Sequence, residues 1–310
     1  LRCLYDFENK KVFFPDIHAS FKFSTLVFGG VERIFKRAQC AFYLHRVDQL
    51  KDPDRLLFLG PEDFLSVNPN TGAAPVFRSR RDADITTTIY RRQPVLVDRR
   101  TETKQMPPVR VLPLRYLRMF DMTIDSKLFK RRDELETAGW YPVDGNRWKK
   151  GNAEALPLYE GKMVQMYDHR AANVVVHSDN VHRAAQQEPV GPEQHQNPKF
   201  SPTPQFFVYR SDIDKVEKSD WAIAFKLITA PTNMRTMISA ILPKCAIGNS
   251  MGMLLPEAED RKAYAEWAPL LQANIASFAL DYCLRQKVQG QNINWYMVEQ
   301  LPLIRPEQFD

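Results

Sequence analysis

The chain of 310 residues has no apolar stretch long enough to cross a membrane, and it has only four cysteines. Its most apolar segments, such as residues 221–230, end after about ten residues, whereas a membrane-spanning helix needs about 20. Cys3, Cys40, Cys245 and Cys283 lie far apart, without the close spacing of a metal-binding or redox motif. We therefore expect no membrane segment, no disulfide framework and reduced thiols, as in a cytoplasmic protein.

Sequence motifs of nucleotide-dependent and metal-dependent enzymes are also absent. Gly29-Gly30 lacks the third glycine of a dinucleotide-binding turn, and no Gly-Lys-Ser or Gly-Lys-Thr sequence occurs. The six histidines are scattered, and no His/Cys set has the spacing of a zinc site. No pair of carboxylates stands in a context that marks it as catalytic. We therefore expect no catalytic residue, no metal and no cofactor in this chain.

The composition is that of a folded protein, with 44% hydrophobic and 26% charged residues. Its length suits two domains or one large domain. The chain starts at Leu1 without an initiator methionine, and no basic region followed by an apolar run marks a secretory signal. We therefore expect it to be part of a longer protein.

Positive charge is concentrated in one part of the sequence. Residues 75–150 contain eighteen Lys and Arg against ten Asp and Glu, a net charge of +8, while the whole chain carries +6. Arginine clusters alternate with Trp140, Tyr141 and Trp148. Guanidinium groups bind phosphate oxygens bidentately and aromatic rings stack on bases. This pattern favours a nucleic-acid-binding surface; the alternative is an ordinary solvated surface.

Local patterns predict the first secondary-structure elements. Residues 5–14 and 20–28 are expected to form an antiparallel hairpin, with a third strand at the edge over residues 41–44. Ser79 followed by Asp82 predicts the start of a helix that extends to about Arg92. Ile85 and Ile89 are expected on the buried side of this helix, which would carry arginines at both ends.

Further along the chain, residues 94–113 are polar and proline-containing, which indicates a connection between domains. We expect a short helix over 133–138 that stops at Gly139, a hairpin turn at 144–145, and strands over 221–227 and 237–242. Residues 177–204 are expected to form a long mobile loop. A single long helix is expected over 257–287, with Trp267, Phe278 and Tyr282 in the core. The polar triplet Asp168-His169-Arg170 could hold a base, a phosphate or a turn.

Several sequence blocks, in one order along the chain, resemble the large adenine-N6 DNA methyltransferases of type IIG restriction–modification, BREX and DISARM systems. The blocks are Tyr-Asp-Phe-Glu-Asn-Lys at 5–10, Phe-Pro-Asp at 14–16, Phe-Lys-Phe-Ser-Thr-Leu at 21–26, Gly-Gly at 29–30, Asn-Pro-Asn-Thr at 68–71, residues 75–83, Leu-Pro-Leu-Tyr-Glu-Gly-Lys-Met at 156–163, Tyr-Asp-His-Arg at 167–170, Asn-Ile-Asn-Trp-Tyr at 292–296 and Gln-Leu-Pro-Leu at 300–303.

This resemblance implies a mixed α/β fold, in which the terminal antiparallel strands of a Rossmann-like methyltransferase sheet precede a mixed α/β target-recognition domain. It implies the end of the catalytic domain over 1–95, a basic connector over 96–150 and the target-recognition domain over 151–310. In the family, the methyl-donor loop and the Asn-Pro-Pro-aromatic motif both precede the first of these blocks, and neither occurs in this sequence; Asn68-Pro69-Asn70-Thr71 is not the second motif, because Asn70 and Thr71 stand where it has a proline and an aromatic residue. The parent protein would bind S-adenosylmethionine upstream and modify a flipped adenine. We expect this chain alone to be inactive.

The expected partners are double-stranded DNA and upstream methyltransferase domains of the same protein, with or without a nuclease domain. Arg and Lys can pair with guanine, and Asn and Gln with adenine. The predicted base-contacting residues are Asn233, Arg235, Lys244, Asn249, Asn292 and Asn294. The predicted phosphate-contacting residues are Arg78, Arg80, Arg81, Arg91, Arg92, Lys162 and Arg170. For each asparagine, the alternative is a role in a local turn or cap.

Two other functions stay open at this point. The chain could be a stand-alone DNA-binding specificity module that recruits a separate enzyme. It could also bind RNA, although neither the aromatic signature of an RNA-recognition motif nor a Gly-x-x-Gly loop is present. A nuclease is disfavoured, since no acidic metal-binding cluster is recognisable.

Overall fold

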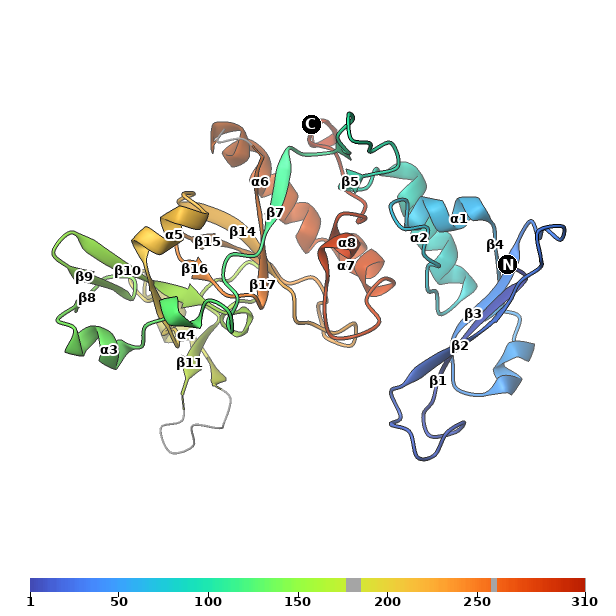
Figure 1. Cartoon of the computed structure of the whole chain (residues 1–310), viewed down its shortest axis with the longest axis horizontal. Coiled ribbons are helices and arrows are strands. Elements are labelled where there is room, and N and C mark those ends of the chain that lie inside the picture. Colours follow the sequence, from blue (N-terminus) through green and yellow to red (C-terminus); the bar gives the residue numbers. More distant parts are fainter. Residues whose placement is uncertain (177–184, 258–260, 310) are drawn as a thin grey trace.

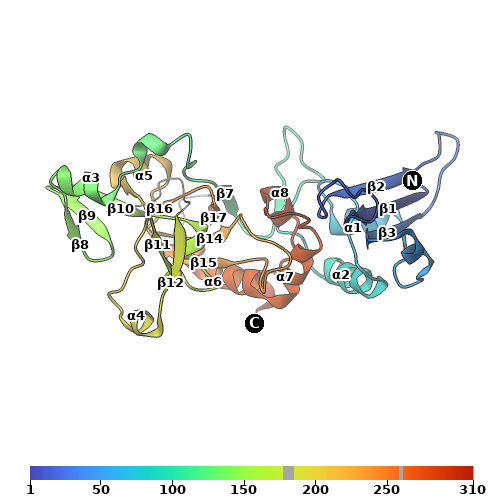
Figure 2. The ribbon, with the colours of Figure 1, turned by 90° about the horizontal axis from the view of Figure 1, so that it is seen from below.

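The computed structural model describes residues 1–176, 185–257 and 261–309. Helices and several mostly antiparallel sheets make up a mixed α/β fold, as predicted. The molecule is elongated, with the N-terminal sheet at one end, strands β8–β10 at the other and helices α6–α8 between them (Figures 1 and 2). The Rossmann-like character of the N-terminal sheet stays a prediction. No helix in the described residues is long and apolar enough to span a membrane.

The N-terminal sheet has the strand order β2-β1-β3-β4. β1 (Cys3–Glu8) and β2 (Lys22–Val27) pair antiparallel, which confirms the predicted hairpin. The expected third strand is β3 (Ala38–Leu44), but it is not at the edge. It pairs in parallel with β1 and antiparallel with β4 (Leu57–Leu59), which places its mostly buried residues inside the sheet. A 3₁₀ turn, η1 (Val47–Lys51), joins β3 to β4.

Helices α1 (Pro61–Val67) and α2 (Arg80–Arg92) follow this sheet. The predicted cap of α2 is confirmed, because Ser79 Oγ accepts a hydrogen bond from the Asp82 backbone N–H at 3.2 Å. The predicted orientation was wrong for Ile85, which is 40% exposed. The buried stripe consists instead of Ala83, Thr86, Thr87 and Tyr90. These positions follow the three- and four-residue spacing of one helix face.

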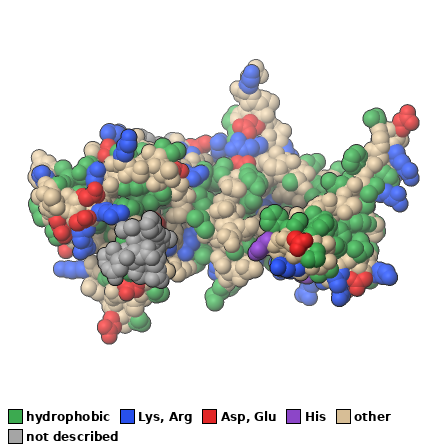
Figure 3. Space-filling view, turned by 60° about the horizontal axis from the view of Figure 1, so that its bottom comes forward, with side chains coloured by type: hydrophobic (Ala, Val, Ile, Leu, Met, Phe, Trp, Pro, Cys, Tyr) green, Lys and Arg blue, Asp and Glu red, His purple; other side chains and the backbone are tan. Residues whose placement is uncertain are grey.

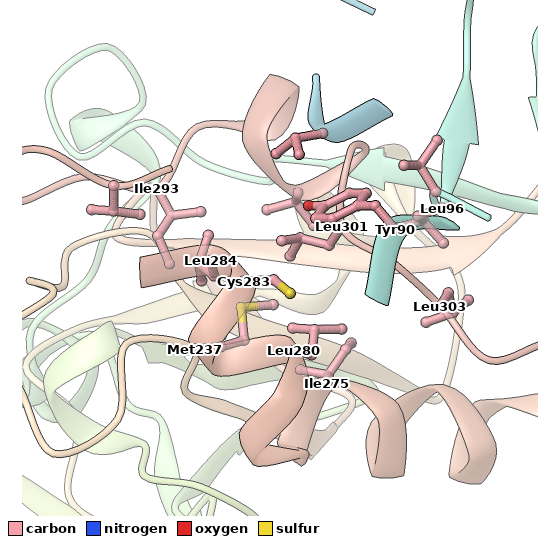
Figure 4. Packing of buried hydrophobic residues seen from close by; sticks show 14 of the residues in the cluster. Tyr90, Leu96, Met237, Ile275, Leu280, Cys283, Leu284, Ile293, Leu301 and Leu303 are labelled. Atoms are coloured by element: carbon pink, nitrogen blue, oxygen red, sulfur yellow. The ribbon is translucent and has the colours of Figure 1, made fainter. Parts of the chain in front are cut away.

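After α2 the chain pairs with its own C-terminal part. The predicted connection contains only the short strands β5 (Val97–Asp98) and β6 (Val109–Arg110). The Leu96 backbone N–H donates to the Leu301 carbonyl, and the Leu303 N–H donates to the Pro94 carbonyl, both at 2.9 Å. Side chains from both segments pack around Tyr90 and α7, as Figure 4 shows.

The central sheet has the order β15-β14-β17-β7, with every neighbouring pair antiparallel. It consists of β7 (Leu114–Leu117), β14 (Trp221–Lys226), β15 (Ser239–Pro243) and β17 (Met251–Pro256). The strands predicted over 221–227 and 237–242 are thus confirmed. β14 is buried on both faces, because two clusters of apolar side chains pack on its opposite sides; Ile223 and Phe225 belong to one cluster, and Ala222 and Ala224 to the other.

The single helix expected over 257–287 was wrong. The described residues form α6 (Arg261–Ala276) and α7 (Phe278–Arg285), separated at Ser277. Ser277 caps α7, since its hydroxyl accepts from the Leu280 backbone N–H. Phe278 is 80% exposed and not part of the core. The short helix α8 (Trp295–Val298) and a 3₁₀ turn, η4 (Pro306–Gln308), follow.

The remaining strands and short helices form the end of the molecule opposite the N-terminal sheet. β10 (Ala153–Tyr159) pairs with β9 (Arg147–Lys150), β13 (Phe207–Tyr209) and β16 (Ala246–Ile247), and β9 pairs with β8 (Tyr141–Val143). The predicted turn at 144–145 connects β8 to β9. Around this sheet lie η2 (Ser126–Leu128), α3 (Arg132–Thr137), η3 (Gly161–Met163) and α5 (Arg210–Val216). Gly139, with φ +79°, ends α3 as predicted.

The expectation of an unstructured loop over 177–204 was wrong for its later part. β12 (Gln186–Pro189) pairs antiparallel with β11 (Ala172–Val175), and α4 (Pro192–Gln196) follows. β12 has no apolar alternation because all four of its residues are exposed. Residues 177–184 lie outside the described residues.

Residues from all three predicted segments share one large buried cluster, which contains Phe77, Leu114 and Leu284. This cluster continues across residues 95 and 150. The division into three functional segments at these positions stays a prediction. Cys3, Cys40, Cys245 and Cys283 are buried free thiols. Burial raises the pKa of the Cys40 thiol to about 11 and that of Cys283 to about 12, so neither is an activated nucleophile.

Candidate nucleic-acid interface

The solvent-facing side of α2 carries two pairs of arginines. Arg80 and Arg81 begin the helix, and Arg91 and Arg92 end it. The pairs are about three helical turns apart, so they lie on the same side, about 16 Å from each other along the axis. All four side chains are exposed. This spacing is sufficient to reach phosphates at both edges of a major groove, which is about 12 Å wide.

Most of this charge is not neutralised within the protein. Arg80, Arg81 and Arg92 have no ion pair in the described part of the chain, and Arg91 lies at the limit of one, 3.9 Å from Asp63. Arg80 and Arg81 also occupy the first helical turn, where the helix dipole disfavours positive charge. An external anion would relieve both effects.

A second group of arginines lines a cavity of about 1020 Å³ at the C-terminal end of α2. We call it the arginine cavity. Four arginines and only two carboxylates line it, from segments far apart in the sequence: Arg92, Arg100, Arg110, Arg305, Asp98 and Glu307. Arg100 forms a fork with Asp98, and Arg110 pairs with Glu257 at 3.0 Å. Arg92 and Arg305 have no ion-pair partner within the described ranges.

One turn, residues 68–72, separates this cavity from another. Asn70 fixes the turn with both ends of its side-chain amide and with its backbone N–H. Its side-chain amide donates to the Val97 carbonyl at 2.9 Å, its side-chain oxygen accepts from the Arg99 N–H at 2.8 Å, and its backbone N–H donates to Gln300. Arg99 in turn pairs with buried Glu299 at 2.9 Å. The turn is therefore held rigidly by segments distant in the sequence.

The second cavity, of about 440 Å³, lies on the other side of this turn. Asn68 lines it, whereas the next residue, Pro69, lines the arginine cavity. Five of its side-chain carboxamides have no hydrogen-bond partner among the residues that the structure describes: Gln286, Gln289, Gln291, Asn292 and Asn294. We call it the carboxamide pocket. Ala74, Val76 and Met297 supply apolar lining, and Tyr296 is half exposed beside it.

Lys287 is the charged residue that lines the carboxamide pocket. Its Nζ donates to the Val67 carbonyl at 2.6 Å and to Asn68 Oδ1, and lies 5.1 Å from the centre of the Tyr90 ring. Burial lowers the pKa of this amine to about 7. Near neutral pH the positive charge of this amine is therefore reduced, whereas the arginines of the neighbouring cavity stay fully charged.

The structure does not bring all the predicted phosphate-contacting residues together. Arg78 is near α2, but its guanidinium packs on the Tyr43 ring at 5.0 Å. Lys162 belongs to η3 and Arg170 lies just before β11, and β11 lies in the opposite half of the molecule from α2 (Figures 1 and 2). Lys162 pairs with Glu160 at 3.1 Å. Arg170 donates to the carbonyls of residues 195 and 197, both at 3.1 Å, and so fastens α4 to the chain.

The predicted base-contacting residues also divide into two groups. Asn292 and Asn294 are exposed and line the carboxamide pocket. Lys244 pairs with Asp214, and Asn249 donates to Asp121 at 2.8 Å. Their polar groups are thus used inside the protein.

The last two predicted base contacts lie in one loop that packs on α7. Asn233 donates to Thr229 at 3.2 Å. Arg235 donates to the carbonyl of Ala276, the last residue of α6, and to that of Ser277, and its guanidinium stacks on Phe278, 4.6 Å from the ring centre. It therefore serves as a C-terminal cap for α6.

The Asp168-His169-Arg170 triplet forms a structural turn. Asp168 Oδ2 lies 2.9 Å from His195 Nε2, and the other ring nitrogen of His195 lies 3.2 Å from the Gly191 carbonyl. His169 is partly buried, and burial together with Arg170 lowers its pKa. No group of three or more potential metal ligands occurs among the described residues.

Sequence reasoning missed Arg110, Arg305 and the three glutamines of the carboxamide pocket. The arginines are isolated in the sequence, and only the fold brings them to one cavity. The glutamines did leave a signal, because five carboxamide residues occur within positions 286–294.

On the face shown in Figure 3, lysine and arginine side chains form several separate groups and not one continuous band. Positive charge on this face alone therefore does not define a groove. No protein-family model and no curated protein matches the chain.

Proposed function

We propose that this chain is the DNA-recognition portion of an adenine-N6 DNA methyltransferase of a restriction–modification or phage-defence system. The sequence blocks that resemble that family support the assignment. In this proposal, S-adenosylmethionine and the methyl-transfer chemistry belong to upstream domains of the parent protein, and this chain supplies contact with double-stranded DNA.

The observation that carries the proposal is the set of exposed, uncompensated arginines on α2 and in the arginine cavity. Guanidinium groups without an internal partner keep their capacity for bidentate contact with phosphate. Arg80, Arg81, Arg91 and Arg92 would hold the DNA backbone, and Arg305 would add a further contact. Arg170 is not needed for this role, because its donors already serve backbone carbonyls.

The test is binding of the whole chain to a pool of random duplex DNA across a salt series, with sequencing of the retained fraction. An asymmetric motif recovered together with a steep salt slope is the expected result. Salt-dependent binding without a motif would favour a chain that grips phosphate and needs the catalytic domain to read sequence. Absence of binding at low salt would contradict the proposal.

A stand-alone specificity module is the second candidate. It predicts the same motif and the same salt slope, but with no methyltransferase encoded in the same polypeptide. Competition by RNA or single-stranded DNA that exceeds competition by duplex DNA would instead favour a single-strand binder.

A further inference from the structure

A groove of about 560 Å³ lies between the edge of the N-terminal sheet and α2. All three residues of β4, 57–59, line it, so we call it the β4 groove. One face of α2 supplies most of the remaining lining, at positions three and four residues apart: Arg80, Ala83, Asp84, Thr87, Thr88 and Arg91. Arg37 and Asp63 complete it. The groove is therefore bounded by an edge strand and by one face of a helix.

The backbone of β4 is available to a further strand. β4 ends the strand order of its sheet and pairs with β3 on one side. Outside this ladder, no hydrogen bond among the described residues uses the backbone of residues 57–59. Alternate residues of such a strand direct their N–H and C=O groups away from the sheet. The edge is therefore a template to which an extended peptide can add by backbone pairing.

The face of α2 in the groove has small side chains between two arginines. Ala83, Thr87 and Thr88 leave room beside the helix, and the Thr87 hydroxyl already donates to the Ala83 carbonyl at 2.8 Å. Arg80 and Arg91 lie at the two ends of this face, about 16 Å apart along the axis, and both are exposed. An added strand would thus meet small residues along the helix and a guanidinium at either end.

Positive charge exceeds negative charge in the groove. Three arginines line it, against the two carboxylates of Asp63 and Asp84. Asp63 is buried and already has partners, because it accepts the Gly60 backbone N–H at 2.9 Å and lies 3.6 Å from Arg37. Arg80 has no ion pair in the part of the chain that the structure describes. A carboxylate on the added strand can therefore form a bidentate pair with Arg80.

We propose that the β4 groove binds an extended acidic segment of a partner protein, which adds to β4 as a further strand and places carboxylates against Arg80 and Arg91. Backbone pairing would supply affinity, and the arginines would supply the preference for acidic sequences. This inference does not rest on the proposed DNA binding. The partner and DNA would compete for these two arginines, whereas Arg81 and Arg92, which do not line the groove, would stay free for DNA.

The test measures binding of the whole chain to a fluorescein-labelled ten-residue peptide in which glutamate and valine alternate. A second peptide has the same sequence but is N-methylated at every backbone nitrogen, so it keeps its charge and loses its strand donors. We expect the first peptide to bind at least about tenfold more tightly by fluorescence anisotropy. Its binding should also slow hydrogen exchange of the amides of residues 57–59.

Two double variants separate the groove from the charge of α2 in general. Arg80→Gln/Arg91→Gln should weaken binding of the first peptide about tenfold. The matched control, Arg81→Gln/Arg92→Gln, removes the same charge from the same helix outside the groove and should change the affinity by less than about twofold. All four side chains are exposed, so both variants should fold normally, which their urea transitions would verify.

Equal binding of the two peptides would reveal attraction of a polyanion without strand addition, and it would overturn the inference. Equal effects of the two double variants, or tighter binding of a peptide with lysine in place of glutamate, would overturn it as well. A chain that binds duplex DNA but shows none of these peptide effects would defeat the inference alone and leave the proposed function intact.

Discussion

The arginines of α2 and those of the C-terminal half look alike in the sequence but have different surroundings in the structure. Arg80, Arg81 and Arg92 point into solvent without a partner in the described residues, whereas Arg170 and Arg235 are used to fasten loops and helix ends. We infer that an arginine is available to bind a ligand only when no backbone carbonyl or carboxylate already accepts its hydrogen bonds.

Asp281 should contribute most to holding the arginines that have partners inside the protein, because it pairs with both Arg235 and Arg285. It is 3% exposed, accepts from the backbone N–H groups of Thr236 and Met237, and pairs with Arg285 at 2.8 Å. Asp281→Asn would leave buried donors and arginines unmatched, so we expect a loss of about 3–5 kcal/mol in the free energy of unfolding, measured in urea.

The control for this variant is Asp48→Asn, because the pair between Asp48 and Arg46 is well exposed. Removal of that pair should cost less than about 1 kcal/mol. Equal effects of the two substitutions would mean that Arg235 and Arg285 are not held by Asp281 in solution.

Lys287 connects the C-terminal helices to the N-terminal part of the chain. It follows α7, and its amine donates to the carbonyl of Val67, the last residue of α1. Its folded-state pKa of about 7 is below the usual 10.5, so between these values the unfolded chain binds more protons than the folded one. The free energy of unfolding should therefore rise with pH above 7, by about 2 kcal/mol between pH 7 and pH 9 relative to Lys287→Met. Parallel stability curves for wild type and variant would contradict the burial of this amine.

The double substitution Arg91→Gln/Arg92→Gln tests whether the exposed arginines of α2 bind DNA. This variant should bind duplex DNA about tenfold more weakly, and the slope of log K against log salt should fall by about 1–2. A control with the same loss of charge is Arg46→Gln/Lys51→Gln, which lies outside the basic stretch. If both variants lose affinity equally, general positive charge and not α2 would be responsible.

The smallest effect is expected for Asn249→Ala, because that side chain already holds Asp121. Its DNA affinity should stay within about twofold of wild type, below the discrimination of about 1–3 kcal/mol that a base-pairing side chain provides. Its unfolding midpoint should fall slightly. A large loss of affinity with unchanged stability would return Asn249 to the base-contacting group.

The elements that were predictable are those whose signals are local. The hairpin of β1 and β2 follows from strand alternation, and the start of α2 follows from Ser79 and Asp82. The break between α6 and α7 at Ser277 was not predicted, because apolar residues recur at helical spacing on both sides of it. Strand β12 was not predicted, because its exposed residues show no alternation of apolar and polar side chains. Each of these elements also depends on a contact with another segment, because β12 pairs with β11 and Arg235 donates to the carbonyls of residues 276 and 277.

The same reason limits prediction of the site. The sequence shows that arginines are abundant at 78–92 and carboxamides at 286–294; the second segment lines the carboxamide pocket, but only Tyr90 and Arg92 of the first line the arginine cavity. It does not show that Arg305 joins Arg92, or that Arg170 is already occupied. Those facts depend on contacts between segments that are far apart in the chain.

The backbone pairing of residues 94–97 with residues 299–303 has a consequence for biosynthesis. About 200 residues must be translated after α2 before residues 299–303 exist, which takes about 10–40 s at ordinary elongation rates. During this interval the face of α2 that carries Tyr90 is uncovered. The N-terminal half therefore has to wait on the ribosome in an incomplete state, and a chaperone that shields this face should raise the yield of folded protein.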